Sequence, residues 1–364
     1  MSETAAIDQL FQAMVQVGAS DLHLCVGSTP MVRKDGHMQP LDAAAGPLAE
    51  HDVVQLLTPI IPEKNRDEFA RRHDSDFAYE IRGLARFRAN IFADRKGPGA
   101  VFRVIPSKIL TAEQLNLSPA ILQLCMLNKG LVLVTGPTGS GKSTTLCAMI
   151  DHINRNRQDH IITIEDPIEF VHESQGCLVN HREVGAHTRS FSAALRGALR
   201  EDPDIIMVGE MRDLETIRLA LEAANTGHLV FGTLHTTSAA KTIDRVIEVF
   251  PAEEQAQVRN GLSTGLKVVV AQNLFKRVDK RGRCAALEIL VCTAAVGNLI
   301  REGKTVQIPS AIQTGKQFGM VTLDDAIMGV LQKGWISPEE AYDKSIDKTK
   351  FRPLLKTPPD ELNQ

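Results

Sequence analysis

Residues 131–145, LVLVTGPTGSGKSTT, decide the fold of this chain and the place of its functional site. The run 131–134 is apolar throughout, which predicts a buried strand. Residues 136–143 follow it and match the pattern G-x-x-x-x-G-K-[ST] without a mismatch. Glycines let a backbone approach an anion closely, and the helix that begins near Lys142 aims its positive end at the same place. The stretch therefore predicts a nucleotide-phosphate site; the alternative is a glycine-rich turn that binds no ligand.

The loop also predicts the cofactors, ATP and Mg²⁺. Lys142 should reach the β- and γ-phosphates, and the Ser143 hydroxyl should ligate Mg²⁺. Successive backbone N–H groups should point at phosphate oxygens. The residues that we expect to bind the nucleotide are Gly136, Pro137, Thr138, Gly139, Ser140, Gly141, Lys142, Ser143 and Thr144.

Length and composition are those of a globular protein with two domains. A chain of 364 residues exceeds the size at which a single core stops growing, about 250 to 300 residues. The net charge of −3 disfavours nucleic acid as a partner. The first ten residues lack the basic and apolar segments of a secretory signal, and no apolar run approaches the ~18 residues of a membrane span. We therefore expect a cytoplasmic protein.

The part of the chain before residue 107 predicts a small domain of mixed strands and helices. Apolar residues from Ile7 to Val15 recur at helical spacing, and Asp35-Gly36 is typical of a tight hairpin turn. A helical stretch is expected around residues 52–71. Strands are expected at residues 20–24, 75–81, 85–92 and 100–105.

Arginines alternate with apolar residues in one of these strands. Arg86 and Arg88 share one face of strand 85–92, and the residues between and beside them take the other. Arg103 lies in the last strand of the domain. The arginine face must meet solvent or an anion, and the spacing alone leaves both open.

A second domain follows a polar stretch that two prolines bracket. Residues 107–119 are therefore expected to link the domains. Beyond them, apolar runs alternate with helical patterns, as in a parallel sheet whose strands are buried on both faces. The runs are residues 131–134, 161–164, 205–208 and 229–234. Ligands of such sheets bind beyond the carboxyl ends of the strands.

Carboxylates and histidines stand at these strand ends. Glu165 follows the second run and Glu210 follows the third, where Mg²⁺ coordination and activation of a water are expected. His235 and His228 flank the fourth run, and we place both near the same rim. An imidazole there can hydrogen-bond a γ-phosphate or a carboxylate. These four side chains are our candidate catalytic residues.

Four motifs in order resemble those of one known family. They are GPTGSGKST at 136–144, TIEDPIEFVH at 163–172, ALREDPDIIMVGEMRD at 198–213 and GHLVFGTLHT at 227–236. They are similar to the Walker A, Asp box, Walker B and His box of the RecA-like hexameric ATPases of secretion and pilus systems, in particular those of type IV pilus retraction. The likeness extends from SDLHL at 20–24 to QTGKQFGM at 313–320.

The resemblance implies an α/β fold, in which a RecA-like P-loop ATPase core follows a smaller N-terminal α+β domain of PAS-like type. The implied domains are the N-terminal domain at 1–106, a linker at 107–119, the ATPase core at 120–290 and a C-terminal helical region at 291–364.

The resemblance also implies roles that spacing alone does not assign. Glu165 corresponds to the water-activating base, and Glu210 acts on Mg²⁺ or through its water, with the division between the two left open. Arg88 and Arg103 correspond to small-domain arginines that reach nucleotide phosphate. The question of which histidine of the His box segment senses phosphate also stays open.

Cysteine spacing favours one branch of the family. Relatives that drive pilus extension or type II secretion commonly carry a tetracysteine metal motif, whereas the six cysteines here include no C-x-x-C pair. Residues 295–302, AVGNLIRE, resemble the AIRNLIRE signature of retraction, with Val296 and Gly297 in place of Ile and Arg. Retraction is therefore the favoured function.

The resemblance implies a homohexamer that docks peripherally on the cytoplasmic face of the inner membrane. Its implied partner is the inner-membrane pilus platform protein, and a paralogous retraction ATPase is a further candidate partner. Two alternatives stay open. The first is a pilus extension or type II secretion ATPase. The second is an ATP-binding accessory or switch subunit that does not turn over. A nucleic-acid translocase is disfavoured by the acidic balance of the chain.

Overall fold

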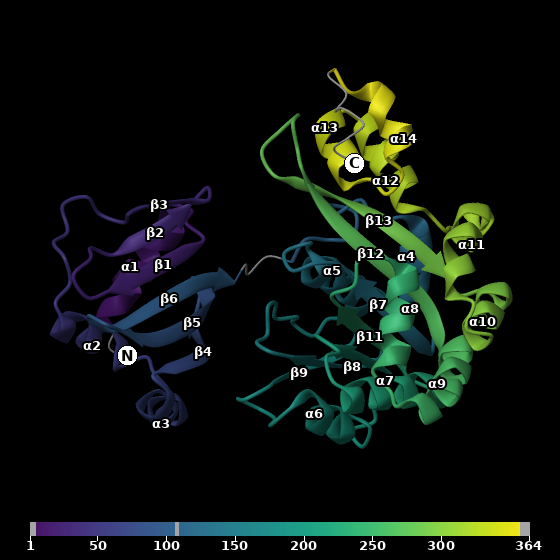
Figure 1. The fold of residues 1–364 in the computed structure, drawn as a ribbon. Coiled ribbons are helices and arrows are strands. Elements are labelled where there is room, and N and C mark those ends of the chain that lie inside the picture. The colour runs from purple at the N-terminus through teal and green to yellow at the C-terminus, as the bar shows by residue number, and fades with distance from the viewer. Residues whose placement is uncertain (1–4, 106–108, 357–364) are drawn as a thin grey trace. The chain divides into compact units, whose positions relative to one another are not determined.

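The computed structural model describes residues 5–105 and 109–356, and the chain divides next to residue 108 into two compact units (Figure 1). The predicted α/β class with a RecA-like core is confirmed, because strands and helices alternate through the second unit. No helix in the described ranges combines the length and the apolar character that crossing a membrane requires.

The first unit is a six-stranded antiparallel sheet with three helices. The strand order is β3-β2-β1-β6-β5-β4. Its helices are α1 (Ala6–Gln16), α2 (Glu50–Leu57) and α3 (Glu63–Arg72). Its strands are β1 (Asp21–Cys25), β2 (Met31–Lys34), β3 (His37–Pro40), β4 (Asp74–Ile81), β5 (Ala85–Asp94) and β6 (Gly97–Ile105).

Aromatic packing builds the core of this unit. Phe11 of α1 stacks on Phe87 of β5 with ring centroids 4.2 Å apart and meets the edge of Phe102 of β6 at 4.9 Å. The predicted hairpin at Asp35-Gly36 is confirmed, since both residues have positive φ angles between β2 and β3. The helical stretch expected around residues 52–71 consists of two helices: α2 ends at Leu57, and α3 begins after its N-cap residue, Pro62.

The second unit is a seven-stranded sheet of order β13-β12-β7-β11-β10-β8-β9, parallel except for the β12–β13 pair. Its strands are β7 (Gly130–Thr135), β8 (His160–Glu165), β9 (Leu178–Glu183), β10 (Ile205–Val208), β11 (Leu229–Leu234), β12 (Leu266–Lys276) and β13 (Arg283–Val291). The four predicted apolar runs are confirmed as β7, β8, β10 and β11. The other three strands were not predicted.

Helices cover both faces of this sheet (Figure 1). They are α4 (Pro119–Cys125), α5 (Lys142–Asn156), α6 (Phe191–Ala198), α7 (Leu214–Thr226), α8 (Ala239–Glu248) and α9 (Ala252–Gly265). Alternate residues of β7 point into opposite cores: Leu131 and Leu133 pack with α6 to α9, whereas Val132 and Val134 pack with α4 and α5. This two-sided burial explains why the strand sequences are continuously apolar.

Helices make up the chain after β13. They are α10 (Ala294–Arg301), α11 (Ile308–Thr314), α12 (Leu323–Gln332), α13 (Pro338–Lys344) and α14 (Lys348–Phe351), with short 3-10 turns at Thr305–Gln307, Lys316–Phe318 and Arg352–Leu354. Helices α12 to α14 pack on the far end of the β12–β13 hairpin around Phe275 and Phe351 (Figure 1). The predicted linker 107–119 lies partly outside the described residues. From Ile109 on it belongs to the second unit, where Ala112 and Leu117 are buried.

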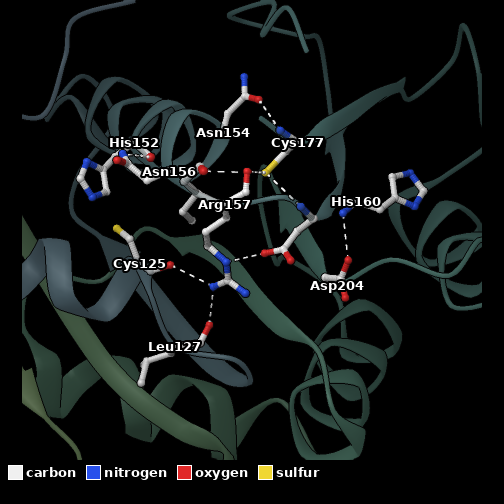
Figure 2. A network of polar contacts seen from close by, with 11 residues as sticks. Cys125, Leu127, His152, Asn154, Asn156, Arg157, His160, Cys177 and Asp204 are labelled. Atoms are coloured by element: carbon white, nitrogen blue, oxygen red, sulfur yellow. Dashed lines mark hydrogen bonds and ion pairs between the residues drawn. The ribbon is translucent and has the colours of Figure 1, made fainter. Parts of the chain in front are cut away.

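A polar network closes the amino-terminal edge of the sheet, at the far end of α5 (Figure 2). The Arg157 guanidinium donates to the carbonyl oxygens of Cys125 (3.2 Å) and Leu127 (2.6 Å) and pairs with Asp159. Asn154 is fully buried; its Nδ2 donates to the Glu173 carbonyl at 2.8 Å, and its Oδ1 accepts from the backbone N–H groups of residues 175 and 177. This edge therefore joins α4, α5 and the chain before β9.

Candidate nucleotide site

The parallel strands bring the predicted site segments to one edge of the sheet. Strands β7, β11, β10 and β8 are consecutive neighbours, so their carboxyl ends lie side by side. The phosphate loop follows β7, His235 follows β11, Glu210 lies two residues beyond β10, and Glu165 ends β8. The prediction that these segments meet at the carboxyl edge is confirmed.

Glycines shape the phosphate loop. Gly136, Gly139 and Gly141 all have φ angles between +77° and +147°, a region that disfavours other residues. A Cβ on Gly136 would lie 2.4 Å from the Gln272 carbonyl oxygen, whereas a Cβ on Gly139 would meet nothing within 4 Å. The loop is therefore packed against the protein on one side and open on the other.

Several polar groups of the loop are arranged to receive an anion. Lys142 Nζ donates to the carbonyl oxygens of Gly136 (2.9 Å) and Pro137 (3.1 Å), so the ammonium lies within the loop. Helix α5 begins at Lys142 after Gly141, which provides no side-chain cap for the first N–H groups. The buried Ser140 hydroxyl has no hydrogen-bond partner among the described residues. These features fit a bound phosphate group.

The Glu210 carboxylate contacts two side chains, those of His235 and Arg212. Its Oε1 lies 2.7 Å from His235 Nε2, and it forms an ion pair with Arg212. Burial, which leaves the Glu210 side chain 17% exposed, works to raise the pKa of Glu210, but hydrogen bonding and charge from Arg212 and His235 outweigh it and hold this pKa below its usual value. Glu210 is therefore ionised at neutral pH.

Glu165 lies beside the start of the Glu210 segment. The Gly209 N–H donates to the Ile164 carbonyl at 2.7 Å, and a Cβ on Gly209 would lie 3.4 Å from Glu165 Cα. The Glu165 side chain is buried. A small residue at 209 thus lets the two carboxylate-bearing segments approach closely.

His181 of β9 lies next to Glu165, and sequence reasoning missed it. Its Nδ1 is 2.7 Å from Thr163 Oγ1 and 3.7 Å from Glu165 Oε1. His181 Nε2 lies 3.0 Å from the His172 backbone N–H and 3.3 Å from the His172 carbonyl oxygen; because a backbone N–H can only donate, the shorter contact makes Nε2 the acceptor and leaves the proton of the neutral ring on Nδ1. The ring therefore presents an N–H to Thr163 and Glu165.

His172 stacks on His181 with ring centroids 5.9 Å apart. It is buried, and neither of its ring nitrogens has a hydrogen-bond partner in the described part of the chain. Burial lowers the pKa of His172 to about 4, with a smaller contribution from His181. His172 is therefore a neutral residue that packs on His181.

The prediction that His228 and His235 lie near one rim is wrong. They flank β11 at opposite ends, and a six-residue strand separates its ends by about 20 Å. The backbone N–H of His228 instead donates to the Ala223 carbonyl oxygen, and the ring Nδ1 lies 3.1 Å from the same oxygen, so His228 caps the carboxyl end of α7. His228 is at the edge opposite to the phosphate loop.

Arg88 and Arg103 are direct cross-strand partners in the first unit. Both side chains are exposed, and the sequence left open whether this face meets solvent or an anion. Arg103 Nε donates to Asp21 Oδ1 at 2.8 Å, whereas Arg88 Nε is 3.8 Å from Asp76 Oδ1. Two like charges placed opposite each other repel, and an anion bound between them would relieve that repulsion.

Two cavities of the second unit open at the site. One of about 380 Å³ is lined by Gly141, Thr144, Thr145 and Gln272, and also by Trp335. The other, of about 390 Å³, borders Glu210, Arg212 and His235. Within the described residues, no three His, Cys, Asp or Glu side chains form a metal site by themselves. A Mg²⁺ ion bound mainly by nucleotide and water oxygens needs no such cluster.

Comparisons with known proteins agree with this geometry. A family model described as Type II/IV secretion system protein matches residues 3–298. The Type IV pilus retractation ATPase PilT of Pseudomonas aeruginosa is 56% identical over 339 residues, which cover 93% of this chain and 98% of the relative. The Twitching motility protein of Neisseria gonorrhoeae is 52% identical over 314 residues, which cover 86% of this chain and 83% of the relative.

A solved structure is similar along the whole chain. The crystal structure of the pilus retraction motor PilT with bound ADP matches with a TM-score of 0.89 and 44% identity, covering 96% of this chain and 99% of that one. The matches thus include both units, and the structural neighbour holds a nucleotide.

Proposed function

Because the chain belongs to the type II/IV secretion system protein family, we propose that it works as its named relatives do, hydrolysing ATP to retract a type IV pilus. It is a P-loop ATPase of the retraction type, and a nucleotide is its cofactor. The observation that carries this function is the phosphate loop with Lys142 inside it, at the same sheet edge as Glu165 and Glu210.

The loop residues bind the phosphates in this proposal. The backbone N–H groups of residues 136–144 and the first turn of α5 supply donors, and Lys142 Nζ exchanges the Gly136 and Pro137 carbonyls for phosphate oxygens. Ser143 provides one Mg²⁺ ligand. Mg²⁺ neutralises phosphate charge when it is bound. The 380 Å³ cavity beside Thr144 and Thr145 is large enough for the nucleoside.

The carboxylates share the remaining work. Glu165, buried and next to the Nδ1–H of His181, is the proposed base that accepts a proton from the attacking water. Glu210, ionised and paired with Arg212 and His235, is proposed to hold Mg²⁺ through a water molecule. His235 contacts Glu210 directly, so it is the proposed sensor of the γ-phosphate, and His228 is not.

Arginines of the first unit and the assembly complete the proposal. Arg88 and Arg103 present adjacent exposed cations, which we assign to nucleotide phosphate in a homohexamer. The motor would act on the inner-membrane platform protein from the cytoplasmic face, with a paralogous retraction ATPase as a further partner. Extension and secretion remain the alternative uses of the same motor.

Steady-state phosphate release with Mg-ATP tests the function. We expect turnover by the wild type, none by Lys142→Ala, and strongly reduced turnover by Arg88→Ala with ADP binding retained. Arg72→Ala, an exposed α3 arginine paired with Glu68, is the matched control and should match the wild type. A wild type that binds ATP but releases no phosphate would overturn the motor and leave the accessory switch as the function.

A further inference from the structure

Gln272 of β12 lies far from the phosphate loop in sequence but hydrogen-bonds both to the loop and to the helix that follows it. Its Nε2 donates to the Ser140 carbonyl oxygen at 2.7 Å. Its Oε1 accepts from the Thr145 hydroxyl at 2.7 Å. The side chain is 2% exposed, so water does not compete for either contact. One buried amide thus ties the loop to the first turn of α5.

The glycines of the loop leave room for this residue. A Cβ on Gly136 would lie 2.4 Å from the Gln272 carbonyl oxygen, and a Cβ on Gly141 would lie 2.9 Å from Gln272 Nε2. Both distances are shorter than real Cβ contacts. The glycines at 136 and 141 are therefore needed as much for the approach of β12 as for the positive φ angles.

The contact with Ser140 determines where the next amide points. The peptide bond is planar and trans, so the Ser140 carbonyl and the Gly141 N–H point in opposite directions. Because Gln272 holds that carbonyl toward β12, the Gly141 N–H must point away from β12. Without the Gln272 donor, the buried Ser140 carbonyl would lack this hydrogen bond. The peptide between Ser140 and Gly141 would then be less restrained in its orientation.

We propose that Gln272 is a positioning residue that aims the backbone amides of the phosphate loop at nucleotide phosphates. This rests on the proposed function, in which residues 136–144 bind those phosphates. The Thr145 contact adds a second restraint, because it fixes the same amide side chain to the helix that carries Lys142 and Ser143.

The test uses variants that remove the contacts one at a time. Gln272→Glu keeps the acceptor for Thr145 but replaces the donor to Ser140 with a carboxylate oxygen. Gln272→Met removes both contacts without adding charge, and Thr145→Val removes the hydroxyl alone. Asn154→Asp is the matched control, since it changes an equally buried amide, at the other end of α5, that donates to the Glu173 backbone carbonyl.

Two quantities are measured on the full chain: the Kd for a fluorescent ADP analogue and the melting temperature without nucleotide. We expect the Kd to rise about tenfold or more for both Gln272 variants and less for Thr145→Val. The Asn154→Asp control should lower the melting temperature and leave the Kd within twofold of wild type. Thr145→Val should add little to Gln272→Met, because its acceptor is already gone.

The outcomes separate this inference from the proposed function. Gln272 variants that melt earlier but keep the wild-type Kd would show a structural role only and overturn the inference. Fully additive effects of Gln272→Met and Thr145→Val would overturn the shared restraint. A wild type that binds no ADP would instead overturn the proposed function itself.

Discussion

The two edges of the sheet in the second unit differ in whether their polar groups are hydrogen-bonded within the protein. At the amino-terminal edge, Arg157 and Asn154 each make several hydrogen bonds to backbone groups and tie neighbouring segments together; Figure 2 shows those of Arg157 to Cys125 and Leu127. At the carboxyl edge, the loop has glycines with positive φ angles, and the buried Ser140 hydroxyl has no partner among the described residues.

The difference shows which edge can bind a ligand. Polar groups that are already satisfied by the protein gain little from an added molecule, whereas donors that lack a partner gain a full interaction. One edge therefore contributes to the stability of the unit, and the other keeps its interactions for phosphate. If this division is correct, substitutions at the two edges will affect different measurements.

The largest effect is expected at the carboxyl edge. Glu210→Gln keeps the shape of the side chain but removes the charge that pairs with Arg212 and serves Mg²⁺. We expect kcat for phosphate release to fall by about a hundredfold to a thousandfold, with a small change in melting temperature. Glu201→Gln, an exposed carboxylate paired with Arg182, is the control. Near-normal turnover by Glu210→Gln would remove Glu210 from the catalytic machinery.

The second largest effect is expected from a substitution at the amino-terminal edge, and it concerns stability. Arg157→Met keeps the aliphatic stem but leaves two carbonyls and Asp159 without their donor. We expect the free energy of unfolding to fall by about 3 kcal/mol, measured by urea denaturation, with the nucleotide Kd unchanged. Arg196→Met, which removes an exposed ion pair with Glu215, should cost well under 1 kcal/mol. A tenfold change in the nucleotide Kd for Arg157→Met would contradict the division between the edges.

The buried His172 adds a pH dependence with a definite sign. Its folded pKa of about 4 lies below the ordinary value of 6.5, so the unfolded chain binds more protons between these values. The stabilisation is complete above pH 6.5 and is lost as the pH falls toward 4. Between pH 7.5 and 5, the unfolding free energy should fall by about 2 kcal/mol more in the wild type than in His172→Phe. Equal pH slopes in urea titrations would show that His172 is not the group responsible.

Patterns in the sequence predicted the continuously apolar strands of the second unit and the functional residues that directly follow two of them. Apolar runs located β7, β8, β10 and β11, and the rule for parallel sheets placed Glu165 and Glu210 at the correct edge. The prediction misplaced His228. This residue precedes β11 and His235 follows it, so the two lie at opposite ends of the strand and only His235 lies at the carboxyl edge.

The missed residues have no local signal. His181 lies in β9, whose polar and half-exposed residues carry no strand pattern as clear as that of a buried run. Gln272 lies in the middle of β12 next to Asn273, and the sequence does not distinguish a buried amide there from a surface one until the register with β7 is known. Both contacts depend on the order of strands in the sheet, which the sequence pattern does not specify.

The smallest expected effect tests the histidine behind the proposed base. His181→Leu removes the Nδ1–H that lies near Glu165 and Thr163, and we expect kcat to fall about tenfold with the KM for ATP within twofold. His181→Asn places an amide N–H where Nδ1 stands, so it should recover most of the rate. Recovery by Asn together with loss in Leu would assign the effect to the hydrogen-bond donor rather than to packing. Because the loss is expected in kcat while the Arg157 substitution changes only stability, this variant also tests whether β9 belongs functionally to the carboxyl edge.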